Sequence, residues 1–184
     1  ENDALGGIDP YSASKACAEL VVNSYRNSFF NRNNSPLVAT ARAGNVIGGG
    51  DWAKDRILPD IIRSITKNEE LKIRYPNSTR PWQHVLEPLS GYLLLGQLLL
   101  ENNTNLATAW NFGPNVDGVQ SVESLLAEIK TIWSEIKWSI DKQLHYAESN
   151  LLNLDWSKAR LLLKWYPVWD FNKAVQKTIL WYKN

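Results

Sequence analysis

A tyrosine and a lysine four residues apart near the start of the sequence could perform acid–base chemistry. Tyr11 and Lys15 lie in the run Pro-Tyr-Ser-Ala-Ser-Lys, and on a helix this spacing places both side chains on one face. An ammonium beside a phenol favours the phenolate and moves its pKa from about 10 towards neutrality. Such a tyrosine could take the proton of a sugar or alcohol hydroxyl while hydride leaves the carbon to a nicotinamide ring. The simpler alternative is an exposed pair that only covers helix surface.

A glycine-rich loop and an arginine offer further contacts to a ligand. Three consecutive glycines at 48–50 follow an apolar segment and would let backbone approach a ligand closely, although a flexible surface loop has the same composition. The dinucleotide-binding pattern Gly-x-Gly-x-x-Gly does not occur in the sequence. Arg80 could form two hydrogen bonds to a phosphate, or a surface ion pair. His84, taken alone, is typical of a structural hydrogen bond, and Trp82 of a core position.

Helices and short strands alternate along the chain and would position these residues. Expected helices cover 16–25 with entry at Pro10, from 56 or 59 to 65, 88–100, 121–133, from 155 or 157 to 163, and from a cap at Asp170. Expected strands cover 37–42, 71–75, 110–112 and 144–146. A helix, an apolar strand and a glycine-rich loop in succession indicate an α/β sheet, in which ligands bind beyond the carboxyl ends of the strands.

Composition excludes several classes of protein. With 184 residues, 44% of them hydrophobic, and a net charge of +1, the sequence predicts a globular protein that binds neither nucleic acid nor a membrane. A single cysteine excludes an internal disulfide and fits the cytoplasm, and we expect Cys17 to be a small buried helix residue. One cysteine and two histidines predict no metal site. The absence of methionine, with a polar loop directly before the Tyr–Lys pair, predicts the C-terminal part of a longer protein.

Together these segments resemble the extended short-chain dehydrogenase/reductase family, and within it the NAD-dependent sugar-nucleotide epimerases and dehydratases. The resemblance extends over essentially all 184 residues. Its generic part is Tyr11-x-x-x-Lys15 and Arg42-x-x-Asn45, whereas the strings at 45–53 and 79–92 are more specific and resemble the 4,6-dehydratases. The closing segment from 154 through Trp181-Tyr182 is also similar to that of the family.

The resemblance implies the C-terminal part of a Rossmann-type, doubly wound parallel sheet with a smaller, interleaved α/β substrate-binding domain. Residues 1–48 and 81–113 would complete the NAD-binding domain. Residues 49–80 and 114–184 would form the sugar-nucleotide-binding domain, with the ligand between the two. The family also implies a cytoplasmic homo-oligomer, either a dimer or a tetramer.

The activity implied is a hydro-lyase reaction that uses NAD and converts CDP-glucose to CDP-4-keto-6-deoxyglucose, in deoxysugar and lipopolysaccharide biosynthesis. The choice of CDP over dTDP or GDP rests on the resemblance alone. The catalytic residues would be Tyr11 and Lys15, and both would also bind the cofactor, together with Arg42. The residues implied in substrate binding are Asn45, Arg56, Arg74, Arg80 at the diphosphate, and His84.

Two alternatives stay open at the level of sequence. A sugar-nucleotide 4-epimerase would share the Tyr, Lys, Asn and Arg but needs no elimination residues. A non-catalytic sugar-nucleotide-binding module could keep the fold, although retention of both Tyr11 and Lys15 argues against it. The cofactor fingerprint and the residues that take the C5 proton and donate to C6 are expected upstream of residue 1. We therefore expect the 184 residues alone to be inactive.

Overall fold

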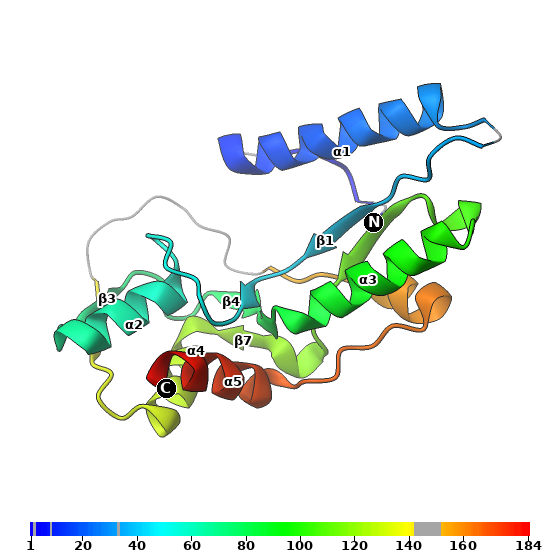
Figure 1. The fold of residues 1–184 in the computed structure, drawn as a ribbon. Helices are drawn as coiled ribbons and strands as arrows, with labels where there is room; N and C mark the ends of the chain where they lie inside the picture. The colour runs from blue at the N-terminus through cyan, green and yellow to red at the C-terminus, as the bar shows by residue number, and fades with distance from the viewer. Residues whose placement is uncertain (2, 8, 33, 142–151) are drawn as a thin grey trace. The chain divides into compact units, whose positions relative to one another are not determined.

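The computed structural model describes residues 1, 3–7, 9–32, 34–141 and 152–184, which divide into two compact units (Figure 1). Unit 1 comprises Glu1–Arg42, Ser90–Phe112 and Asp155–Trp165. Unit 2 comprises Ala43–Leu89, Gly113–Leu154 and Tyr166–Asn184. The units therefore alternate along the chain. The division into a cofactor domain and a substrate domain stays a prediction.

Unit 1 begins with the helix α1, Pro10–Phe29, which starts at the proline that the sequence predicts and continues four residues beyond the expected end. The carboxylate of Asp9 accepts hydrogen bonds from the N–H groups of Tyr11 at 2.9 Å and Ser12 at 3.0 Å, and therefore caps the helix. Because Pro10 has no N–H, its place in the first turn leaves no donor unpaired.

The remaining elements of unit 1 enclose an aromatic core. They are β1 (Thr40–Ala43) paired with β6 (Ala109–Phe112), α3 (Leu86–Leu100) from Ser90 onward, η1 (Thr104–Leu106) and the π-helix η3 (Ala159–Leu163). Phe112 and Trp165 meet edge to face with ring centroids 5.0 Å apart, and Tyr92 and Trp156 extend the cluster. Gly91 permits this packing, because a Cβ at that position would lie 2.2 Å from the Phe112 ring.

Unit 2 contains three two-stranded pairings in the described residues. The parallel pairs are β2 (Val46–Ile47) with β5 (Gln83–His84) and β3 (Leu71–Ile73) with β8 (Trp138–Ile140). The antiparallel pair is β4 (Thr79–Pro81) with β7 (Val119–Ser121). The order of helices and strands within this unit is that of an α/β fold with short strands.

Three helices cover the core of unit 2. They are α2 (Ile57–Lys67), α4 (Val122–Ile132) and α5 (Phe171–Lys183), and the 3-10 turn η2 (Val116–Gly118) precedes β7. Ser121 accepts a hydrogen bond from the N–H of Ser124 at 3.0 Å and thereby caps α4. Asp170 accepts one from the N–H of Lys173 at 2.7 Å, which confirms the cap predicted there. The core joins fully buried aliphatic side chains from all three helices: Ile61, Leu125, Leu126, Ile129, Val175 and Ile179.

Some details of the sequence interpretation were wrong. Cys17 is exposed, because it lies on α1, where Ala16 is the buried position. The helix expected to reach residue 163 does end there, before Lys164 with a left-handed φ of 57°, but Ala159–Leu163 has π-helical instead of α-helical pairing. The strand expected at 144–146 lies outside the described residues.

Among the described helices, none combines the length and the apolar character that crossing a lipid bilayer requires.

Candidate active site

The predicted Tyr–Lys pair is formed on the first turns of α1. The Nζ of Lys15 lies 5.4 Å from the centroid of the Tyr11 ring, as the four-residue spacing predicts. Tyr11 is 72% exposed, so its phenol is open to a ligand. The Ser14 hydroxyl donates to the Tyr11 carbonyl at 2.7 Å and thereby stays close to the helix backbone. The arrangement offers a phenol, a cation beside it and small neighbouring side chains.

Arg42 lies on β1 and is linked to α1. Its Nε is 3.6 Å from Oε1 of Glu19, and Oε2 of Glu19 accepts a hydrogen bond from the Thr40 hydroxyl at 2.8 Å. The Nε and Nη2 atoms of Arg42 are buried and form no hydrogen bond with any part of the chain that the structure describes. Tyr11, Lys15 and Arg42 therefore belong to one unit, and Glu19 connects the helix of the pair to the strand of the arginine.

The predicted substrate-binding residues all belong to unit 2. Asn45 follows β1, and its carbonyl accepts a hydrogen bond from the N–H of Gln83 at 3.1 Å, which brings it beside β5. Arg56 precedes α2 and its Nη1 donates to Oδ2 of Asp51 at 2.9 Å. Arg74 directly follows β3 and is exposed.

Arg80 and His84 are buried rather than exposed. The Nη1 of Arg80 donates to the Thr79 carbonyl at 2.8 Å. Nδ1 of His84 accepts a hydrogen bond from the N–H of Leu86 at 3.3 Å, and its ring lies 4.8 Å from that of Trp169. Burial lowers the pKa of His84, although the nearby Glu87 carboxylate opposes the shift. These contacts agree with a structural histidine, and a substrate contact for it stays a prediction.

Sequence reasoning assigned no role to two residues that contact the loop leading to Arg56, Tyr182 and Arg63. Tyr182 forms hydrogen bonds with the backbone of Asp51, and Arg63 forms them with the next two carbonyls of the loop. The tail motif Trp181-Tyr182 was the available signal, but the sequence does not say which segment it contacts. No group of three His, Cys, Asp or Glu side chains that could hold a metal ion occurs among the residues with described positions.

Comparison with solved structures defines the class of fold. A UDP-glucose-4-epimerase from Stenotrophomonas maltophila matches all of this chain with a TM-score of 0.81 at 18% identity, over 57% of its own chain. A dTDP-glucose 4,6-dehydratase from Bacillus anthracis, solved in complex with NAD, matches all of it with a TM-score of 0.78 at 20% identity, over 55% of its own chain. The predicted Rossmann-type α/β fold is thereby confirmed.

Comparison of sequences then defines the family. The model of the NAD dependent epimerase/dehydratase family matches residues 1–107, and the chain belongs to that family. The CDP-glucose 4,6-dehydratase of Salmonella typhimurium is 47% identical across this whole chain, which covers 52% of that relative. The chain spans about half the length of the curated relatives it matches.

Proposed function

We propose that this chain is the part of an NAD-dependent sugar-nucleotide 4,6-dehydratase that carries the catalytic Tyr–Lys pair and substrate-binding residues, with CDP-glucose as the substrate. The observation that carries the proposal is the contact between the Lys15 ammonium and the exposed Tyr11 ring. The 47% identity to the Salmonella typhimurium CDP-glucose 4,6-dehydratase supports the choice of substrate.

The residues around the pair fit a nicotinamide cofactor. Lys15 supplies ammonium donors for ribose hydroxyls, and Tyr11 is exposed next to the small residues Ser12 and Ala13. The chemistry that NAD supplies when bound is removal of hydride from C4 of the sugar and its return at C6. Arg42 is the further cofactor residue that we propose, because its Nη2 is buried and forms no hydrogen bond with the described residues, while its Nε lies 3.6 Å from the Glu19 carboxylate.

In this reaction Tyr11 takes the proton of the C4 hydroxyl, and the Lys15 ammonium stabilises the charge on the phenolate. The resulting 4-ketone makes the C5 proton acidic enough to be removed, and the C6 hydroxyl then leaves as water. We assign no residue of this chain to the C5 and C6 proton transfers.

We propose the two-domain division expected from the sequence, with two substrate contacts, Asn45 and His84, supplied by the cofactor-domain segments. Residues 49–80 and 114–184 bind the sugar nucleotide, and residues 1–48 and 81–113 contribute to the cofactor domain. Arg80 contacts the diphosphate and Asn45 the sugar, while Arg56, Arg74 and His84 contact the nucleotide. We further propose that the protein is cytoplasmic and forms a homo-oligomer, either a dimer or a tetramer. Light scattering on the purified protein measures the oligomeric state.

The test is turnover of CDP-glucose by the full-length gene product and its Tyr11→Phe variant. With the wild-type protein, we expect mass spectrometry to show a product that is lighter than CDP-glucose by one water. The kcat of the variant should be about 10²- to 10⁴-fold lower because the base is gone. Calorimetry should give the same affinity for CDP-glucose in both proteins. Tyr25→Phe is the matched control, since it removes an exposed phenol of the same helix away from Lys15.

Two other outcomes would contradict the proposal. A product of unchanged mass with inverted C4, seen by NMR, would make the protein a 4-epimerase. Wild-type protein that binds CDP-glucose without turnover, and a Tyr11→Phe variant that behaves identically, would make it a binding module.

A further inference from the structure

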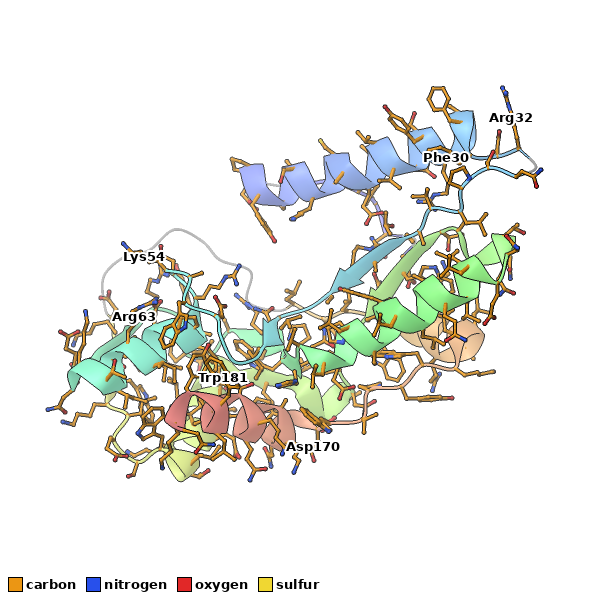
Figure 2. The ribbon with its side chains drawn as sticks, viewed as in Figure 1. Phe30, Arg32, Lys54, Arg63, Asp170 and Trp181 are labelled. Carbon is orange, nitrogen blue, oxygen red and sulfur yellow. The ribbon has the colours of Figure 1, made fainter. Side chains whose placement is uncertain are left out.

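The loop at 48–56 joins β2 to α2 and packs against the end of α5, within unit 2. A Cβ at Gly49 would lie 2.2 Å from the indole of Trp181, so a larger residue does not fit there. Gly50 has a φ of +80°, which residues with side chains rarely adopt. The path of the loop is therefore matched to the ring of Trp181, which is labelled in Figure 2.

Tyr182, the next residue on α5, pairs both backbone polar groups of Asp51. Its hydroxyl accepts a hydrogen bond from the Asp51 N–H at 3.0 Å and donates to the Asp51 carbonyl at 2.8 Å. The ring of Trp52 lies edge-on to that of Tyr182, with centroids 5.2 Å apart. Burial, together with the charge of Asp51, raises the pKa of Tyr182, so the phenol keeps its proton at neutral pH.

A side chain from α2 holds the following part of the same loop. Arg63, which is labelled in Figure 2, donates Nη1 to the Trp52 carbonyl at 3.0 Å and Nη2 to the Ala53 carbonyl at 3.1 Å. It also pairs with Asp60 one turn earlier on its own helix. Two helices therefore fix successive residues of the loop, α5 at Asp51 and α2 at Trp52 and Ala53.

With its backbone fixed, Asp51 presents its carboxylate to Arg56. Oδ1 accepts a hydrogen bond from the Ala53 N–H at 3.0 Å, and Oδ2 accepts one from Nη1 of Arg56 at 2.9 Å. Partial burial opposes ionisation of this carboxyl, but the Ala53 N–H and the Arg56 guanidinium hold its pKa below the usual value. The ion pair is therefore present at neutral pH.

The pair matters because the Arg56 side chain is 66% exposed. An exposed arginine that must become ordered around a ligand loses rotamer entropy, which weakens binding. Contact with Asp51 through Nη1 limits that freedom in advance. The planar guanidinium still has Nε and Nη2 donors, whose fork geometry matches a phosphate.

We propose that Tyr182 is a positioning residue for substrate binding, which fixes the backbone of Asp51 so that Arg56 is held ready for the anionic part of a nucleoside diphosphate. This inference rests on the proposed function, in which Arg56 is a substrate-binding residue. Tyr182 itself acts through Asp51 and Arg56 and not by contact with the reacting atoms.

The experiment measures CDP binding by calorimetry and CDP-glucose turnover, in the full-length gene product and in Tyr182→Phe. The variant keeps the ring that packs on Trp52 but loses the hydroxyl. We expect the Kd for CDP and the KM for CDP-glucose to rise by about tenfold, because one hydrogen bond that supports the site is lost. We expect kcat to stay within about twofold, since the lost interaction serves the ground state and the transition state equally.

A double-mutant cycle separates positioning from general loosening. In an Arg56→Gln background, Tyr182→Phe should produce no further loss of CDP affinity, because the group it positions is gone. Lys183→Gln is the matched control on α5, since it breaks a 3.0 Å hydrogen bond to the Ile132 carbonyl and leaves the loop contacts intact. Its CDP affinity should equal that of the wild type.

Wild-type CDP affinity in Tyr182→Phe, the same loss in the Arg56→Gln background, or an equal loss in Lys183→Gln would each overturn the inference. Wild-type protein that binds CDP but converts no CDP-glucose would contradict the proposed function alone, because the binding ratios still decide the role of Tyr182. Wild-type protein that binds neither compound would overturn both.

Discussion

Helix α1 of unit 1 differs from helices α4 and α5 of unit 2 in how much of its apolar surface it buries. In unit 2, Leu125 and Ile179 have no exposed surface, and they pack in a core shared by three helices. In unit 1, Ala16 is the buried residue of α1, whereas apolar residues further along that helix remain more than half exposed: Leu20, Val21, Tyr25 and Phe29. The helix that carries the proposed catalytic pair thus leaves a row of apolar side chains exposed.

This difference shows where the stability of each site comes from. The 48–56 loop is supported by α2 and α5, which are anchored in a closed core. The Tyr11–Lys15 pair lies on a helix that is attached through a few polar contacts, namely Glu19 to Arg42 and Thr40, and Arg26 to the Ala107 carbonyl. The position of the pair relative to β1 and β6 therefore depends on these contacts.

The largest expected effect comes from truncating the core of unit 2. Leu125→Ala should lower the free energy of unfolding by about 2–5 kcal/mol, because it leaves a cavity in a fully buried site. Leu20→Ala, at a residue 55% exposed on α1, should change it by less than about 0.5 kcal/mol. Urea unfolding of the 184-residue chain followed by circular dichroism measures both.

The same pair of variants in the full-length gene product sharpens the comparison. A much larger cost for Leu20→Ala there would mean that further residues or a second copy cover the apolar face of α1. Equal costs for the two substitutions in the 184-residue chain would contradict the contrast between the units.

A smaller effect is expected from the contact that joins α1 to β1. Glu19→Ala removes the partner of a half-buried Arg42, so it should destabilise this link by about 1–3 kcal/mol. Hydrogen exchange measured by mass spectrometry should show faster exchange in α1 and unchanged exchange in α4. Glu123→Ala is the control, because it removes an exposed carboxylate from α4. Unchanged exchange in α1 would show that the helix is held by other contacts.

The smallest expected effect is the change in stability with pH that His84 of unit 2 causes. Since burial lowers the pKa of His84 in the folded state, the unfolded state binds more protons once the pH falls below about 6.5. Stability should therefore decrease as the solution is acidified through this range, and His84→Gln should flatten that decrease. Urea midpoints between pH 5 and 8 measure it. The prediction fails if both proteins lose stability in parallel.

Much of the helical framework could be predicted from the sequence. The caps at Ser121 and Asp170 mark α4 and α5 because hydroxyl and carboxylate side chains pair with free N–H groups at helix starts. Strands β2 and β5 are two residues long, which is too short for an alternation of apolar and polar residues to be recognised in the sequence. The exposure of Cys17 was missed because periodicity gives the buried face of a helix only when the partner surface is known.

The candidate site also has one contact that the sequence predicts and others that it does not. The Tyr11–Lys15 contact follows from helical spacing alone, so a stretch of five residues predicts it. The pairing of Tyr182 with Asp51 joins positions 131 apart in the chain, and no local pattern encodes such a contact. The burial of Arg80 likewise results from tertiary packing, which a charged residue in a sequence does not reveal.

The fit between Gly49 and Trp181 also bears on engineering with parts from relatives. Because the indole occupies the space that a side chain at 49 would need, the loop and the end of α5 can be exchanged only together. A chimera that receives the 48–56 loop of a relative therefore has to receive that relative's residues at the positions of 181 and 182 as well. Transplanting the loop alone would combine a donor backbone with a host ring shaped for a different path.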